Sequence, residues 1–123
     1  MKKESVDCRR VAIPEGWPPP TSSSWYLLSN LLENPGDFFW IRDREGNVTE
    51  LLIWIPGDQG GTVAPIPVRR TPQGQDDNGI WYEWNGDEER PTLKPSIERN
   101  RGCKSGRNYW HGHLDDGCLV SCP

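Results

Sequence analysis

Glycine and proline recur along almost the whole chain, and their spread limits the structures that the chain can form. Thirteen glycines and twelve prolines occur among 123 residues. Because proline interrupts helices and glycine favours turns, we expect many turns, short strands and few long helices. Only 33% of the residues are hydrophobic, but seven are tryptophan, whereas disordered chains are poor in aromatic residues. The sequence therefore predicts one small folded domain that is mostly β (α+β), with a core of large rings.

Residues 1–20 predict an extended N-terminal arm in front of a single β-rich domain at residues 21–123. The arm is charged at first and then rich in proline, and three successive prolines at 18–20 favour a polyproline conformation. Such a segment is ordered only where it lies on a surface. Trp17 is the candidate anchor, either on the domain's own core or on a binding partner.

One helix is predicted at residues 22–33. The serines at 22–24 can cap its start, and the Asn-Pro-Gly sequence at 34–36 ends it. The apolar residues with helical spacing are Trp25, Leu28, Leu31 and Leu32. We expect this apolar face to pack on a sheet.

Apolar, β-branched and aromatic runs predict strands at residues 38–41, 48–55, 62–68, 80–84 and 91–97. The run at 48–55 is largely apolar on both faces, which predicts a central strand. Prolines exclude 62–68 and 91–97 from a central position, so both are predicted to be edge strands. These elements predict a small antiparallel sheet or sandwich with one packed helix. The side chains that we expect to be largely buried are Trp25, Leu28, Trp40, Ile53, Trp81 and Ile97.

The last segment predicts a hairpin with a defined register. A two-residue type I′ turn at Asp116 and Gly117 pairs residue 115 with 118 and, counting back, 113 with 120 and 111 with 122. Since side chains alternate between the faces of a strand, one face is predicted to carry His111, His113, Cys118 and Cys122. The opposite face is predicted to carry Trp110, Leu114 and Leu119. A three-residue turn would shift this register by one and separate the histidines from the cysteines.

Thiolate and imidazole are the ligands that structural zinc prefers, and the hairpin brings several of them together. Zinc is therefore a candidate cofactor, with ligands from His111, His113, Cys118, Cys122 and Cys103. Two alternatives remain open: a pair of satisfied histidines beside small buried thiols, or a disulfide in an oxidising compartment. A cysteine–histidine nucleophile pair is also conceivable, but the chain contains no GxSxG or HExxH motif.

The charge of the chain argues against several partners. A formal net charge of −4 is unusual for a nucleic-acid-binding protein. No apolar run is long enough to span a membrane, and no apolar stretch follows the basic start, so neither a membrane segment nor a secretion signal is predicted. Acidic residues gather at 76–89 and basic residues at 94–107. They form either two solvated loops or a docking surface for a protein partner, with Asp87, Glu88, Glu89 and Trp17 as candidate contacts.

Three motifs carry a resemblance to a known family. The strings Trp-Asn-Gly-Asp at 84–87, Pro-Thr-Leu-Lys-Pro-Ser-Ile at 91–97 and Trp-His-Gly at 110–112, with Asp-Gly at 116–117, resemble a family of small phage and prophage proteins of unknown function. Its members are sometimes mislabelled as ammonia monooxygenases. The resemblance covers about residues 51–122 and implies a β-rich fold and a viral or prophage origin, but no activity. Of the candidate ligands only His111 carries over, because the family's cysteine cluster is replaced by residues 56–60.

The sequence therefore predicts a phage-encoded, non-enzymatic binding or structural module with a viral or host protein partner. It would be a virion accessory component or a protein that docks on a host factor, located in the virion or the host cytoplasm. Two alternatives are a small zinc-dependent hydrolase and an acidic inhibitor of host defence.

Overall fold

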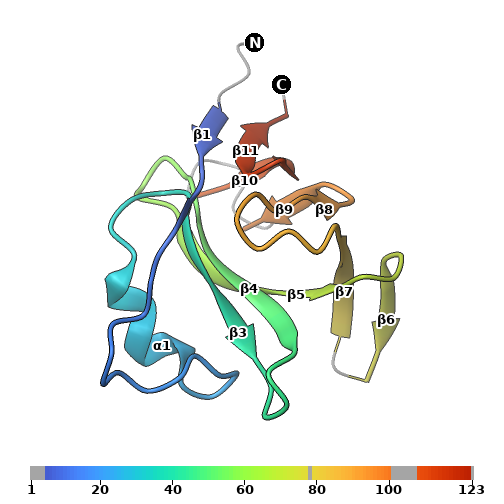
Figure 1. Cartoon of the computed structure of the whole chain (residues 1–123). Coiled ribbons are helices and arrows are strands. Elements are labelled where there is room, and N and C mark those ends of the chain that lie inside the picture. The colour runs from blue at the N-terminus through green and yellow to red at the C-terminus, as the bar shows by residue number, and fades with distance from the viewer. Residues whose placement is uncertain (1–4, 78, 101–107, 123) are drawn as a thin grey trace.

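The computed structural model describes residues 5–77, 79–100 and 108–122. Among these residues 46% lie in strands and 6% in helices, and the sheets curl into a half-barrel (Figure 1). The mostly β fold class is thereby confirmed. The strands are β1 (Ser5–Asp7), β2 (Arg9–Arg10), β3 (Asp37–Arg42), β4 (Val48–Ile55), β5 (Thr62–Arg69), β6 (Gly74–Asp76), β7 (Gly79–Trp84), β8 (Leu93–Lys94), β9 (Ile97–Arg99), β10 (Trp110–Asp115) and β11 (Cys118–Ser121).

The described strands form two separate sheets. The larger has the order β2-β3-β4-β5-β7-β6, with β8 paired to β7, and the smaller has the order β1-β11-β10-β9. Most pairs are antiparallel, but β2 runs parallel to β3 and β5 runs parallel to β7. Strand β4 lies between β3 and β5 and pairs with each along most of its length, which confirms the predicted central strand.

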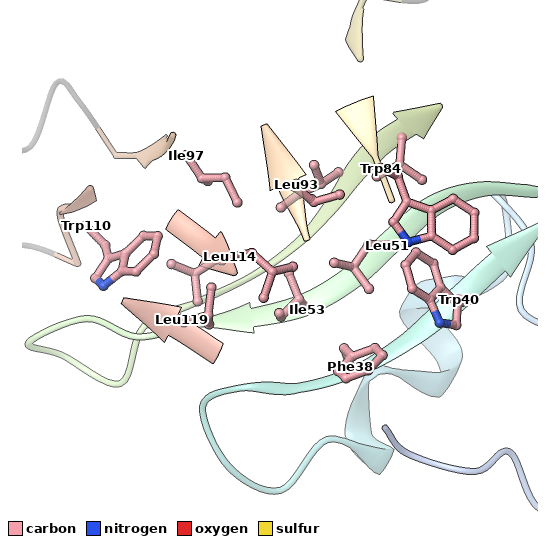
Figure 2. Close-up of a cluster of buried hydrophobic side chains, with 13 residues drawn as sticks. Phe38, Trp40, Leu51, Ile53, Trp84, Leu93, Ile97, Trp110, Leu114 and Leu119 are labelled. Carbon is pink, nitrogen blue, oxygen red and sulfur yellow. The ribbon is translucent and has the colours of Figure 1, made fainter. Parts of the chain in front are cut away.

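Both faces of β4 are covered, and the core therefore has two parts. On one face Leu51, Ile53 and Ile55 meet the inner side chains of the small sheet, as Figure 2 shows for Ile97, Trp110, Leu114 and Leu119. On the other face Leu52 packs with Leu28 and Leu32 from the helical segment. The burial of both faces agrees with the apolar character that the sequence shows on both faces of 48–55.

Four of the six predicted core residues are buried, namely Leu28, Trp40, Ile53 and Ile97. Trp25 is partly buried against the helix-side cluster. The prediction for Trp81 is wrong: its ring lies under the guanidinium of Arg69, 3.9 Å from ring centroid to Cζ, and is only partly buried. The opposite face of β7 enters the core instead, where the ring of Trp84 packs at a tilt against that of Trp40, with centroids 4.7 Å apart.

The helical segment is shorter than predicted. It consists of α1 (Trp25–Leu28) followed by the 3-10 turn η1 (Ser29–Leu31). The hydroxyl of Ser24 donates to the carbonyl of Pro19, and the hydroxyl of Thr21 accepts from the backbone N–H of Ser24. These side chains satisfy backbone groups in a turn before the helix, so the helix begins three residues late. No helix among the described residues is long and apolar enough to cross a membrane.

Strand β5 is not the simple edge strand that its prolines predicted. It pairs with β4 from Thr62 to Pro67 on one side. On its other side β7 joins only at Val68 and Arg69, beyond both prolines. The stretch that contains Pro65 and Pro67 therefore has one open side, which accommodates residues without an N–H donor.

The N-terminal arm lies on its own chain between residues 5 and 13. Strands β1 and β2 add to the two sheets, and Val11 and Ile13 pack against the helix-side cluster. Trp17, the predicted anchor, is 44% exposed. The apolar contacts of the arm thus come from its aliphatic residues.

Candidate functional site: a serine and a histidine on the small sheet

The β10–β11 hairpin has the predicted register. Gly112 pairs with Ser121, His113 with Val120, Leu114 with Leu119 and Asp115 with Cys118. Asp116 and Gly117 both have positive φ, 48° and 72°, as a type I′ turn requires. Because Trp110, Leu114 and Leu119 are buried in the core, His111 and His113 lie on the outer face of the small sheet.

Strand β9 brings a serine to the same outer face. Ile97 pairs with Gly112 and is buried in the core, so its neighbours Ser96 and Glu98 are directed outward. The Oγ of Ser96 lies 3.0 Å from the Nε2 of His111. Both side chains are only partly buried, so the pair is in contact with solvent.

The loop between β7 and β8 connects the two halves of the site. Asn85 Oδ1 accepts from the backbone N–H groups of Asp87 and Thr92, and the indole of Trp84 donates to the carbonyl of Asp87. At the end of this loop the Oγ1 of Thr92 accepts from the N–H of Asp116 at 2.8 Å. The β7–β8 loop, which ends four residues before Ser96, is therefore attached to the turn of the hairpin that carries His111.

Gly112 is required by the packing beneath the histidine. A Cβ at this position would lie 2.3 Å from the carbonyl oxygen of Val120 and 2.6 Å from the ring of Trp110. Contacts this short do not occur for real side chains, so a larger residue would displace the strand next to His111. The glycine thus allows the indole of Trp110 to pack under the strand that presents the imidazole.

A second polar pair lies beside the serine and the histidine. The hydroxyl of Tyr109 donates to Oε2 of Glu98 at 2.5 Å, and this contact is partly buried. Glu98 is the cross-strand partner of His111. The outer face therefore presents a hydroxyl, an imidazole and a carboxylate from adjacent strands.

The start of β10 is held by the loop between β4 and β5. Asn108 accepts at Oδ1 from the N–H groups of Gln59 and Gly61, each at 2.9 Å, and its own N–H donates to Asp58 at 2.6 Å. Asn100 also donates to the carbonyl of Asn108. These contacts fix the strand that carries His111 relative to the large sheet.

The proposed zinc ligands are only partly brought together. His111, His113 and Cys118 lie in the predicted hairpin, Cys122 donates its backbone N–H to the carbonyl of His111, and Cys103 lies outside the described residues. Among the described residues, no three or more histidine, cysteine, aspartate or glutamate side chains are close enough to hold a metal ion. Cys8, Cys118 and Cys122 are free thiols. Zinc at this site stays a prediction.

The acidic residues proposed as partner contacts have partners within the chain. Asp87 accepts from the N–H groups of Arg90 and Glu89, and these hydrogen bonds hold its pKa below the ordinary value. Glu88 forms ion pairs with Arg10 and Arg42, and Glu89 forms one with Arg10. These contacts connect the N-terminal arm to the loop before β8. A protein partner on this surface stays a prediction.

A serine hydroxyl held by an imidazole is the nucleophile–base arrangement of serine hydrolases. Residues 28–122 match the model of the BubE family, described as a bacterial ubiquitination-like system serine protease. The match covers most of the chain, and the protein belongs to this family. No curated protein and no solved structure matches the chain.

Family membership corrects the functional prediction. A family of serine proteases is a family of enzymes, so the prediction of a non-enzymatic phage or virion module is wrong, and the two alternatives, a zinc-dependent hydrolase and an acidic inhibitor, are overturned with it. The error arose because the search for a nucleophile was confined to cysteine and to motifs such as GxSxG. Ser96 lies within one of the three motifs and His111 within another, 15 positions apart. The occurrence of both residues within these motifs is a sequence signal for the pair.

Proposed function

We propose that this chain is an active serine protease in which Ser96 is the nucleophile and His111 the general base. The observation that carries the proposal is the 3.0 Å separation between Ser96 Oγ and His111 Nε2 on an outer face. A general base has to lie within about 2.6–3.2 Å of the group that it deprotonates. Membership of a serine protease family supports the same assignment.

The reaction follows from the arrangement of the two side chains. Ser96 Oγ attacks the carbonyl carbon of the scissile peptide bond, while its proton passes to Nε2 of His111. The C–N bond then breaks, and His111 returns the proton to the departing amine. Water, deprotonated by the same imidazole, attacks the Ser96 ester and releases the acid. Nε2 must be unprotonated at the start, with the ring proton on Nδ1.

The description of the family supports a substrate class. A serine protease of a ubiquitination-like system would act on a protein of that system, so we propose a protein substrate cleaved at a peptide or amide bond. A substrate of this kind reaches Ser96 from the solvent side of the small sheet, where His113 is exposed.

The proposal is tested with a fluorophosphonate probe, which phosphonylates activated serine hydroxyls without the need for a known substrate. We expect one adduct on the intact wild-type chain, assigned to Ser96 by peptide mass spectrometry. Ser96→Ala should abolish the adduct, and His111→Ala should slow its formation by about 10²–10⁴-fold, the contribution of a general base.

Matched controls come from the same chain. Ser29→Ala removes a hydroxyl from η1, and His113→Ala removes the exposed imidazole two residues along the same strand. Both variants should react at the wild-type rate. An adduct on another serine, or equal loss of reactivity in the His111 and His113 variants, would contradict the assignment.

A further inference from the structure

We propose that Glu98 is the carboxylate that positions His111, and that Tyr109 holds Glu98 in place; this inference rests on the proposed function of the Ser96–His111 pair. Glu98 and His111 are direct cross-strand partners in the β9–β10 ladder. The Cβ atoms of such partners lie about 4.5–5.5 Å apart. Both side chains belong to the outer face, since Ile97 and Trp110 beside them are buried.

The core determines which residues lie on this face. A register shift of one residue would turn Glu98 inward and Ile97 outward. Burial of an unpaired carboxylate in the apolar cluster would be costly, so the register that buries Ile97 also places Glu98 beside the imidazole. Ser96, two residues before Glu98, is placed on the same face by the same alternation.

Tyr109 restricts the position of the carboxylate. Its hydroxyl donates to Oε2 of Glu98 at 2.5 Å, and Tyr109 precedes His111 by two residues on the same face of the chain. A carboxylate has about four lone-pair sites, so a hydrogen bond from Tyr109 is compatible with another from an imidazole N–H. The tyrosine thereby keeps the glutamate next to the strand that carries the base.

The carboxylate acts on the step in which charge develops. When Ser96 gives up its proton, His111 becomes an imidazolium, and a neighbouring carboxylate stabilises that cation and keeps Nδ1 protonated. Asp115, the acidic residue of β10 itself, lies four positions from His111, about 13 Å along an extended strand. The structure therefore assigns the positioning role to Glu98, which touches no substrate atom itself.

The test is the rate at which the full chain reacts with the fluorophosphonate probe, followed by intact mass, together with the melting temperature of each variant. Glu98→Gln keeps the size of the side chain and an oxygen that can accept from Tyr109, but removes the charge. We expect it to react about 10- to 100-fold more slowly while melting at the wild-type temperature. Glu98→Asp, which keeps the charge, should recover part of the rate, and Tyr109→Phe should react about three- to tenfold more slowly.

Asp115→Asn is the matched control, because it removes a carboxylate from the same outer face, on the strand that carries His111, without an expected change in rate. A wild-type rate for Glu98→Gln would overturn the positioning role, while loss of the adduct in Ser96→Ala would still support the proposed function. A wild-type chain that forms no adduct at Ser96 would overturn both. If Glu98→Gln melts at a lower temperature, Tyr109→Phe decides: a slower reaction at unchanged melting temperature supports the role, and an unchanged rate overturns it.

Discussion

The central strand of the large sheet and the site strand of the small sheet differ in how many faces they bury. Strand β4 is covered on both faces, by the small sheet on one and by the helical segment on the other. Strand β10 buries Trp110 and Leu114 on one face and leaves His111 and His113 on the other. In this fold the doubly covered strand supports the structure, and the singly covered strand can carry polar, reactive side chains.

The two strands also differ in what positions them. Strand β4 is held by long ladders to β3 and β5. Strand β10 has shorter ladders, to β9 and β11, and contacts at each end add to them, from Asn108 to the loop at 57–61 and from Thr92 to the turn at Asp116. The site is thus held by the rest of the fold, while its own side chains contribute little to the core.

The largest effect on stability is expected from a substitution in the large sheet, next to the strand that is covered on both faces. Phe38 of β3 is fully buried and meets the ring of Trp40 edge-on, with centroids 5.9 Å apart. Phe38→Ala should destabilise the protein by about 3–5 kcal/mol, since it leaves a cavity in the cluster. Thermal or urea unfolding measures this cost. Leu27→Ala, at a side chain that is 53% exposed, is the control and should change stability little. Equal stabilities of the two variants would contradict the comparison.

A smaller, pH-dependent effect is expected at the edge of β3. Asp37 is a buried acidic residue, only 3% exposed. Burial alone would raise its pKa, but hydrogen bonds from Arg9 and from the N–H groups of Glu33 and Asn34 outweigh this and hold its pKa below the ordinary value. Because the pKa of this acid is lower in the folded chain, its ionised form stabilises the fold above about pH 4, and this stability is lost as the pH falls through the folded-state value.

Asp37→Asn should therefore cost about 1–3 kcal/mol at pH 7 and less at pH 3. Urea unfolding of the wild type and the variant across this pH range measures the difference between them. Glu45→Gln, in the exposed turn after β3, is the control, and its difference in stability from the wild type should not become smaller at pH 3. A difference that is the same at pH 3 and pH 7 would exclude the ionised Asp37 as its source.

The sequence predicted best those regions whose structure depends on contacts between residues close together in the chain. The β10–β11 register depends on the Asp116–Gly117 turn, which begins three residues after His113, and the predicted register is the observed one from Gly112 to Asp115. The start of the helical segment depends on hydroxyls of Thr21 and Ser24 that compete for backbone groups, and its length was overestimated. The direction of Trp81 depends on a parallel pairing with β5 that no local pattern encodes.

The site was predicted in part for the same reason. The outer face with His111 and His113 follows from alternation within one hairpin, which the sequence contains. The Ser96–His111 contact joins residues 15 positions apart in the sequence, and it requires that Ile97 pairs with Gly112. That pairing is selected by burial of Ile97 and Trp110, so it becomes visible only when the core is known.

The smallest effect on stability is expected on the outer face itself. Ser96→Ala removes a partly exposed hydroxyl whose described hydrogen bond is to His111, and it leaves no cavity in the apolar cluster. Surface substitutions of this kind change stability by no more than about 0.5 kcal/mol, and replacement of active-site polar groups often stabilises. We therefore expect the Ser96→Ala chain to unfold at the wild-type urea concentration, or slightly above it, although it no longer reacts with the probe. A loss comparable to that of Phe38→Ala would mean that the outer face supports the fold as the core does, and the contrast between the two strands would fail.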